Sequence, residues 1–347
     1  MKILYIGDTN PFSTSFHRLS ALKRLGYEVD SYNPYEVCND QLTNFVLCKV
    51  HFRTGYSFLQ KKIEEWLSAI LGENKKFDLV WVDSGELIGK KCLQILKSVG
   101  IPVILYNVDD PTGKRDGGRF KSLLKALPLY DLVVVVRKET EEECIKLGAN
   151  KVLLVYRSYD EEAHKPYANL EEIPSQFRSE VAFIGTWMRY ENRDEFLLKL
   201  IESGVPVSIW GGRWQKSPNW NKLKPYFRGG GLGGRDYVAA IQGTKVCIGM
   251  LSKGNRDLHT QRSLEVPFAG GLFCAERTSE HLGMYQEGVE AVFWSDAAEC
   301  ARICKELLAD DSLRERIRLA GMQRVRSLGV GNEQTCQTIL ETALQTV

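Results

Sequence analysis

Near-continuous apolar runs alternate with segments of helical spacing along the whole chain. The runs at Asp78–Asp83, Pro102–Tyr106 and Leu132–Val136 consist almost entirely of β-branched, aromatic or other apolar residues. Strands of that composition are typical of parallel sheets, which helices cover on both faces. Between the runs, apolar residues recur every three or four positions, as in Phe16–Leu25. The alternation predicts an α/β fold built on parallel sheets.

The pattern restarts after a polar stretch, Asp160–Ser179, which is interpreted as a linker. A length of 347 residues is enough for two domains, one on each side of it. The remaining predicted strands are Lys2–Ile6, Glu28–Tyr32, Lys151–Val155, Val181–Ile184, Pro206–Trp210, Lys245–Ile248 and Leu272–Ala275. The remaining predicted helices are Tyr56–Leu71, Phe196–Ile201, Tyr237–Ile241, Ala297–Ala309, Leu313–Val325 and Glu333–Leu344.

Composition excludes several classes of protein. Hydrophobic residues make up 44% and charged residues 26%, which is typical of a soluble globular chain. A net charge of +2 gives no reason to expect nucleic-acid binding. No apolar run reaches the roughly 20 residues that span a bilayer, and the first residues are expected to form a strand rather than a signal peptide. The nine cysteines include no CxxC pair, so we expect no metal site and a reducing cytoplasm.

The segment Asp257–Glu265 concentrates polar chemistry beside an apolar turn. Its two end carboxylates stand eight positions apart, with His259, Thr260 and Arg262 between them. Carboxylates suit sugar hydroxyls because they only accept hydrogen bonds, and an arginine suits phosphate because its guanidinium is always charged. Glu265 is expected to open a short helix that the following glycine pair closes. As core residues these side chains would be a poor choice, so the pattern favours a binding site.

This segment resembles the nucleotide-sugar signature of GT-B glycosyltransferases, α/β proteins with two Rossmann-like domains facing each other across a cleft. In that signature a glutamate, seven residues and a second glutamate precede a small-residue turn, and Asp257 and Glu265 stand in the two positions. The C-terminal half is more closely similar to the spore-maturation-protein (CgeB-like) group. The pieces that carry this resemblance are Phe183–Trp187, Trp210–Gly212, Asp257–Glu265, Ala269–Gly271, Ala275–Thr278 and Gly288–Phe293.

The resemblance implies a role for each part of the chain. Residues 1–165 would bind the acceptor, residues 176–328 would bind the nucleotide sugar, and residues 329–347 would form a helix that packs back on the N-terminal domain. The donor would be a UDP-, dTDP- or GDP-linked sugar, with no tightly bound cofactor and no metal. The acceptor would be a glycan, a glycolipid or a protein. The spacing of the two acids favours retention of the anomeric configuration.

The resemblance also assigns the donor site. Glu265 would accept hydrogen bonds from the ribose, and Asp257 would approach the donor sugar. His259, Thr260, Gln261 and Arg262 would lie along the sugar and diphosphate. The turn Gly185–Thr186–Trp187 offers backbone N–H groups to a phosphate. Further candidates are Arg189 or Arg193 for the diphosphate, Gly211 and Gly212 near the base or diphosphate, Leu232 within the glycine-rich stretch Phe227–Arg235, and Lys245 as an added cation. The glycine-rich stretch is equally well interpreted as a flexible loop, and Lys245 as a surface residue.

Candidates in the first half follow the ends of predicted strands. Gly7–Asn10 contains no G-x-G-x-x-G fingerprint, which argues against a dinucleotide enzyme. Ser15, His17 and Arg18 would face the acceptor if this loop lines a binding site. Asp109 and Asp110 follow a buried strand and are interpreted either as a capped turn or as groups near the reacting carbon. With His17, they are the candidates for a general base.

We therefore expect a cytoplasmic glycosyltransferase that acts in cell-surface glycan synthesis. The basic run Lys114–Lys125 is interpreted as a solvated face, or as a contact for an anionic acceptor or for the inner face of the membrane. Two alternatives remain: a nucleotide-sugar epimerase of the same shape, and a non-catalytic carbohydrate-binding or assembly protein. The sequence leaves open the base, the sugar, the acceptor and the oligomeric state.

Overall fold

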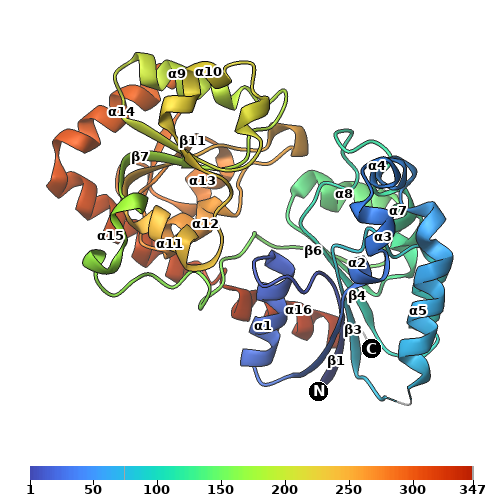
Figure 1. The fold of residues 1–347 in the computed structure, drawn as a ribbon. Coiled ribbons are helices and arrows are strands. Elements are labelled where there is room, and N and C mark those ends of the chain that lie inside the picture. The colour runs from blue at the N-terminus through green and yellow to red at the C-terminus, as the bar shows by residue number, and fades with distance from the viewer. Residues whose placement is uncertain (74, 346–347) are drawn as a thin grey trace. The chain divides into compact units, whose positions relative to one another are not determined.

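The computed structural model describes residues 1–73 and 75–345. These residues form two compact units, each built on a six-stranded parallel sheet (Figure 1). The first unit contains Met1–Tyr156, Gly254–Arg256 and the chain from Asn332 onward, and the second contains Arg157–Lys253 and Asp257–Gly331. Among the described residues, no helix has both the length and the apolar character needed to cross a membrane.

The first unit has the strand order β2-β1-β3-β4-β5-β6. Every neighbouring pair is parallel, so the carboxyl ends of all its strands lie along one edge. Its strands are β1 (Lys2–Ile6), β2 (Glu28–Tyr32), β3 (Leu79–Asp83), β4 (Val103–Asn107), β5 (Leu132–Val135) and β6 (Val152–Leu154). Its helices are α1 (Thr14–Arg24), α2 (Pro34–Val37), α3 (Asn39–Thr43), α4 (Phe45–Thr54), η1 (Ser57–Leu59), α5 (Gln60–Gly72), α6 (Lys90–Lys97), α7 (Lys121–Ala126), η2 (Leu127–Leu129), α8 (Lys138–Lys146) and α16 (Asn332–Leu344).

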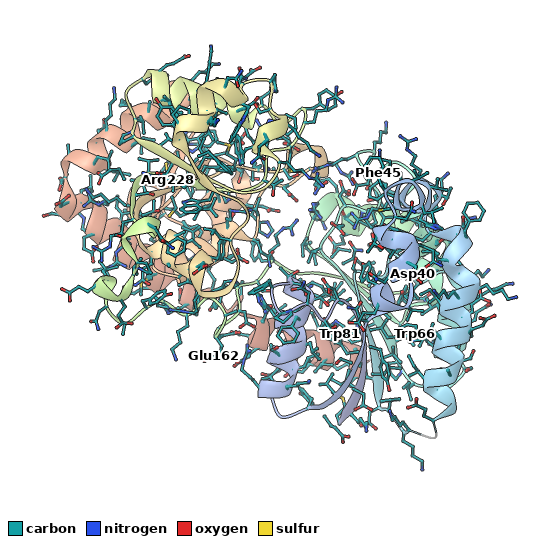
Figure 2. The ribbon with its side chains drawn as sticks, in the orientation of Figure 1. Asp40, Phe45, Trp66, Trp81, Glu162 and Arg228 are labelled. Atoms are coloured by element: carbon teal, nitrogen blue, oxygen red, sulfur yellow. The ribbon has the colours of Figure 1, made fainter. Side chains whose placement is uncertain are left out.

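Successive residues of the central strands face two separate cores. Leu4 packs with α5 and α6 on one face, and Tyr5 packs with α1 and α16 on the other. Figure 2 shows Trp81, which belongs to the second of these cores, among the strands of the sheet. The final helix contributes Ile339 and Leu340 to that core, both almost completely buried. The helix α16 is therefore part of the first unit, although it follows the second unit in the sequence.

The second unit has the strand order β12-β11-β10-β7-β8-β9, again parallel throughout. Its strands are β7 (Ser179–Ile184), β8 (Val207–Trp210), β9 (Phe227–Gly229), β10 (Thr244–Gly249), β11 (Phe273–Glu276) and β12 (Val292–Trp294). Its helices are η3 (Leu170–Glu172), η4 (Ser175–Phe177), α9 (Arg193–Glu202), η5 (Trp214–Lys216), α10 (Trp220–Leu223), η6 (Lys224–Tyr226), α11 (Gly234–Gln242), α12 (Arg262–Phe268), α13 (Ser279–Met284), α14 (Ala297–Ala309) and α15 (Asp311–Ser327). A short η7 spans Lys253–Asn255.

All the apolar runs predicted as strands form strands, but three other predictions are wrong in detail. The helix predicted over 56–71 begins only at Gln60, because Tyr56 adopts a left-handed conformation (φ 58°) and η1 intervenes. Glu265 does not open its helix but is the fourth residue of α12. The polar stretch 160–179 is not a free linker: it belongs to the second unit and places Ile173 and Phe177 in that unit's core.

Candidate donor site in the second unit

The loops after β7 and β8 are joined by hydrogen bonds at the carboxyl edge of the second sheet. The Gly185 N–H donates to the Trp210 carbonyl (2.8 Å), and the Trp187 N–H donates to the Gly212 carbonyl (2.9 Å). Gly211 has a φ of +138°, and a Cβ there would lie 2.0 Å from the Gly185 carbonyl oxygen. Only glycine allows this approach, so the glycine pair predicted as a ligand contact first serves to bring the two loops together.

This pairing leaves one backbone donor of the predicted turn without a partner. Within the part of the chain that the structure describes, the Thr186 N–H makes no hydrogen bond, whereas its carbonyl accepts one from Arg193 Nη1 (2.8 Å). Arg193 is 6% exposed and also donates to the Leu251 carbonyl (2.8 Å), so it holds this loop in place. Arg189 is exposed and stacks on Tyr190 (5.0 Å). Of the two predicted arginines, Arg189 has the accessible guanidinium.

Arg262 connects α12 to the same edge of the sheet. Its Nε donates to the carbonyl of Ile184, the last residue of β7 (2.5 Å). Among the described residues, its two Nη groups have no hydrogen-bond partner, and the side chain is only partly buried. A guanidinium anchored through Nε alone can present the rest of its fork to an anion. The structure therefore brings Arg262 together with the loop that contains Thr186.

Glu265 lies one turn further along α12 and is 6% exposed. The hydroxyl of Tyr237 donates to its Oε2 (2.7 Å), and His164 Nε2 lies 3.5 Å from its Oε1. Burial, followed by the charge of Glu265, raises the pKa of Tyr237 well above its usual value, so the phenol keeps its proton and donates it. A carboxylate has about four acceptor positions, so partners of this kind leave it able to accept further hydrogen bonds.

His281 links α12 to β11 through hydrogen bonds of both ring nitrogens. Its Nδ1 donates to the Glu276 carbonyl (2.7 Å), which leaves Nε2 to accept a hydrogen bond from Ser263 Oγ (2.8 Å). The ring is 1% exposed and stacks on Phe293 (5.5 Å between centroids). Burial lowers the pKa of His281 to about 4, so it is neutral at neutral pH. This buried histidine fixes the orientation of the helix that contains Arg262.

The residues from Asp257 to Gln261 are largely engaged with the protein itself. Asp257 is 6% exposed and accepts a hydrogen bond from Arg157 Nη2 (3.1 Å). His259 Nε2 accepts the Arg157 backbone N–H (3.0 Å), and its Nδ1 donates to Glu280. The prediction that His259 contacts the ligand is therefore wrong, because both ring nitrogens have protein partners and the ring is 2% exposed. Burial lowers its pKa as well.

The other polar groups of this segment shape its backbone. The Thr260 N–H donates to Ser263 Oγ (3.0 Å) just before α12 begins. Gln261 donates through Nε2 to the Ser158 carbonyl (2.9 Å). Its Oε1 is buried and has no partner among the described residues. Buried acceptors are normally satisfied, so Gln261 is a position where a ligand donor would fit.

Two further residues, Lys245 and Leu232, were predicted for the donor site. Lys245 is the second residue of β10, at the amino end of the strand, and pairs with Glu180 (2.8 Å) on the surface. Its assignment as a ligand cation is wrong, because ligands of parallel sheets bind at the carboxyl ends of strands. Leu232 packs against the core just before α11. A Cβ at Gly230 or Gly231, immediately before it, would meet no atom within 4 Å, so that backbone is open.

In the first unit, the two predicted aspartates differ in burial and in their partners. Asp110 is 5% exposed, and Arg256 donates to both of its carboxylate oxygens (2.8 and 2.6 Å). The Asp109 side chain is 29% exposed, with Arg119 Nη2 at 3.4 Å. Asp109 is therefore the more accessible carboxylate. His17 lies half-buried on α1, and its role as a general base remains a prediction.

The prediction that Ser15 and Arg18 face an acceptor is wrong. Arg18 is 1% exposed, and its Nε and Nη2 donate to the two carboxylate oxygens of Asp83 (2.7 and 2.8 Å). The Tyr5 hydroxyl, which has one proton to donate, lies within hydrogen-bond distance of the same carboxylate (2.9 Å) and of the Ser15 carbonyl (2.8 Å). Burial alone would lower the pKa of Arg18, but the charge and hydrogen bonds of Asp83 more than reverse this. This buried ion pair fixes the start of α1 beside the end of β3.

A second polar network at this edge was not predicted. Glu86 is 4% exposed, accepts a hydrogen bond from Tyr35 (2.9 Å) and pairs with Arg119. Burial raises the pKa of Glu86 in spite of the opposing charge of Arg119. Glu86 lies in the loop after β3, three residues past its last residue, so the rule that places sites after buried parallel strands would have selected it.

Comparison with known proteins shows which family and which folds the chain resembles. Residues 191–343 match the model of a family described as glycosyl transferase-like. No curated protein matches the chain. Among solved structures, it is similar to a sucrose-phosphate synthase from Thermosynechococcus elongatus, with 14% identity over 99% of this chain and 98% of that one and a TM-score of 0.71.

Two further structures have the same fold over their full length. HepE from Anabaena, in complex with UDP-glucose, is 13% identical over 100% of both chains, with a TM-score of 0.68. A UDP-forming trehalose-phosphate synthase from Burkholderia xenovorans is 13% identical over 98% of both chains, with a TM-score of 0.62. The chain therefore has the GT-B fold, and its residues 191–343 are similar to a glycosyl transferase-like family.

Proposed function

We propose that the chain transfers a sugar from a nucleotide-diphosphate sugar bound by the second unit. The observation that carries this proposal is the arrangement on α12. Arg262 is anchored to the end of β7 beside the unpartnered Thr186 N–H, and the buried carboxylate of Glu265 lies one turn away. A guanidinium suits a diphosphate and a carboxylate suits the hydroxyls of a ribose, and here the two groups lie one helical turn apart.

The roles of these groups follow from their chemistry. Glu265 accepts hydrogen bonds from the ribose hydroxyls, while Tyr237 holds the carboxylate in position. Arg262 and the Thr186 N–H face the diphosphate, on which negative charge develops as the bond to the sugar breaks. Fixed donors aimed at developing charge are the main source of stabilisation in such a reaction, and they need no metal ion. Asp257 approaches the donor sugar, and we infer that the reaction retains the anomeric configuration.

The comparisons favour uridine as the base. HepE was solved with UDP-glucose, and the Burkholderia xenovorans enzyme is UDP-forming. We therefore take UDP-glucose as the first donor to test. We infer that the acceptor is a glycan or glycolipid of the cell surface. A surface of the first unit, with exposed apolar side chains next to basic ones, supports this inference.

Thermal unfolding with UDP, dTDP, GDP and ADP tests the donor site. A diphosphate at a hundred times its Kd should stabilise the folded protein by about 2.7 kcal/mol. The stabilisation should disappear in Glu265→Gln and persist in Glu180→Gln, a matched change at an exposed carboxylate (46% exposed) of the same unit. If no diphosphate stabilises the protein, or if both variants respond alike, the donor site is wrongly assigned.

Turnover then distinguishes the alternatives. Incubation with UDP-glucose and candidate acceptors should release UDP only when an acceptor is present. Conversion of the donor sugar without an acceptor would instead show an epimerase, and binding without any turnover would show a non-catalytic protein. The anomeric configuration of the product, read by NMR, tests retention.

A surface of the first unit supports an acceptor at a membrane. The side chains of Phe45, Val46 and Val50 on α4 are 73%, 64% and 41% exposed, and Phe58 in η1 is 71% exposed (Figure 2 labels Phe45). Several large apolar side chains exposed together are unusual on a soluble monomer and mark an interaction site. We call Phe45, Val46, Val50 and Phe58 the apolar patch.

Basic residues border the apolar patch. Lys49 lies over the ring of Phe45 (3.6 Å), and Arg53 follows one turn later on α4. The basic run 114–125 reaches the end of the same helix, where Ser122 donates to the Gly55 carbonyl. Apolar side chains next to cations suit the interface of an anionic bilayer, which binds both. We infer that the first unit docks on such a bilayer to reach its acceptor.

Co-sedimentation with vesicles tests this inference. The protein should bind vesicles that contain phosphatidylglycerol and should bind pure phosphatidylcholine vesicles less, with a loss of binding at high salt. Phe45→Ser should weaken binding about tenfold or more, since one buried Phe contributes about 1.5–3 kcal/mol. Leu319→Ser, a matched change at an exposed leucine of the second unit (45% exposed), should not. Absence of vesicle binding, or a dimer that Phe45→Ser dissolves, would contradict docking on lipid.

A further inference from the structure

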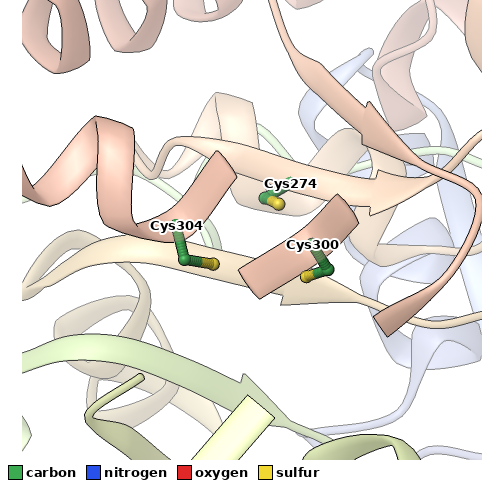
Figure 3. A group of neighbouring side chains, drawn as sticks. All are labelled: Cys274, Cys300 and Cys304. Atoms are coloured by element: carbon green, nitrogen blue, oxygen red, sulfur yellow. The ribbon is translucent and has the colours of Figure 1, made fainter. Parts of the chain in front are cut away.

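Three cysteine side chains from two elements converge in the core of the second unit (Figure 3). Cys274 lies on β11, and Cys300 and Cys304 lie one turn apart on α14 and so share one face of the helix. All three Sγ atoms lie within 4.8 Å of one another, and all three residues are fully buried. Among the described residues, this is the one group of three or more metal-ligating side chains.

The surroundings of the three sulfurs are apolar. The core that contains them consists of aliphatic and aromatic residues such as Leu200, Leu272 and Trp294. An isolated buried cysteine acts as a small apolar side chain. Cys247 is of that kind: it is buried in the other core of this unit, and its Sγ contacts the Ile241 carbonyl (3.4 Å). The group of three differs because each sulfur has two other sulfurs as neighbours.

Charge decides which ion such a site can hold. Three thiolates carry three negative charges, and a net charge in an apolar core is costly. A zinc ion would leave one negative charge and would lack its fourth ligand, since the group offers three. A monovalent copper ion would leave two negative charges. A trivalent thiophilic ion gives a neutral complex and prefers three sulfurs.

We propose that Cys274, Cys300 and Cys304 form a binding site for a trivalent metalloid, for which arsenic(III) is the probe. Arsenous acid and three thiols react without any change of oxidation state. Three As–O bonds break and three As–S bonds form, while the three thiol protons leave with the three hydroxides as water. No oxidant, reductant or further ligand is required.

The geometry suits this product. Arsenic(III) keeps a lone pair, so three sulfurs bound at about 2.3 Å form a pyramid in which they lie roughly 3.5 Å apart. The sulfurs here span no more than 4.8 Å, so small rotations of the side chains bring them to that distance. The complex would link α14 to β11 through a single atom. Uptake should be slow, because the buried sulfurs become accessible only when α14 opens transiently.

Native mass spectrometry of the whole protein, reduced with a phosphine and incubated overnight with arsenite, tests the site. The wild type should retain one arsenic with the loss of three hydrogens, and its Tm should rise. Cys274→Ala and Cys304→Ala should retain none, whereas Cys247→Ala should behave as the wild type. X-ray absorption at the arsenic edge of the wild-type complex should show three sulfur neighbours and no oxygen.

The absorption measurement keeps the test valid even if a variant folds poorly, because it uses the wild type alone. Failure of the wild type to retain arsenic would overturn the proposal. So would equal retention in Cys274→Ala, loss of retention in Cys247→Ala, or an oxygen neighbour on the bound arsenic.

Discussion

Replacing Asp83 with asparagine should destabilise the first unit far more than a change at its surface. Asp83 accepts hydrogen bonds from Arg18 Nε (2.7 Å), Arg18 Nη2 (2.8 Å) and the Tyr5 hydroxyl (2.9 Å). The asparagine keeps one acceptor oxygen and turns an NH₂ group toward the donors that bonded to the other. Arg18 is 1% exposed and keeps its charge, because a guanidinium does not deprotonate in proteins.

The magnitude follows from this burial. Removing one partner of a buried ion pair costs about 3–5 kcal/mol, because the remaining charge is left without compensation. At about 1.4 kcal/mol for each factor of ten, the unfolding equilibrium of the first unit should shift by roughly a hundredfold to a few thousandfold. Replacing both partners, as in Arg18→Met with Asp83→Leu, removes the charge as well as its partner. The double variant should therefore recover most of the lost stability.

Hydrogen exchange measured by mass spectrometry reports the stability of each unit separately, which a single unfolding curve for a two-domain chain does not. Peptides from β1 and β3 should exchange faster in Asp83→Asn, with little change in β7 and β10. The control is Glu333→Gln, which breaks the exposed Arg24–Glu333 pair (2.6 Å) of the same unit and should cost no more than about 1 kcal/mol. The reasoning is refuted if Asp83→Asn costs no more than this control, or if the double variant is as unstable as Asp83→Asn.

Three further predictions concern the second unit. The stability of the second unit should fall by about 3 kcal/mol as the pH drops from 6.5 toward 4, because His281, whose pKa burial lowers to about 4, binds its proton more readily when unfolded. Hydrogen exchange of peptides from β7 and β10 should report this fall, and its dependence on pH should be weaker in His281→Asn. Gly211→Ala should lower the Tm and abolish nucleotide binding, whereas Gly212→Ala, whose Cβ has no neighbour closer than 3.9 Å, should fold normally. Tyr237→Phe should weaken nucleotide binding measured by calorimetry by about 0.5–1.5 kcal/mol, because Glu265 loses the donor that orients it.

Sequence reasoning identified the elements of the fold because their signals are local. The strands could be found from runs of buried residues, and α1 from apolar spacing. The short helices α2 to α4 were not predicted. The helices α2 and α3 have only four and five residues, too few to show a helical period. The helix α4 exposes apolar side chains, the reverse of the pattern that predicts a surface helix. The misplaced start of the helix over 56–71 has a similar cause, since a left-handed tyrosine leaves no mark in the sequence.

The candidate site was only partly predictable for a different reason. Asp257, Arg262 and Glu265 share one short segment, so their pattern could be recognised. Tyr237 and Arg157 could not be found this way, because their bonds to Glu265 and Asp257 join positions 28 and 100 residues apart. The error at Lys245 was avoidable, since its place at the amino end of a predicted strand already argued against ligand binding.

The position of α16 has a consequence for how the protein is made. The core beneath α1 is complete only when Ile339 and Leu340 are in place, although β1 and α1 are translated first. The second unit needs nothing beyond Gly331. On the ribosome, the second unit can therefore finish folding while the first still exposes the face that α16 covers. The unit translated first is the last to close its core, and a pause in synthesis before residue 332 would leave that apolar face open to chaperones or to aggregation.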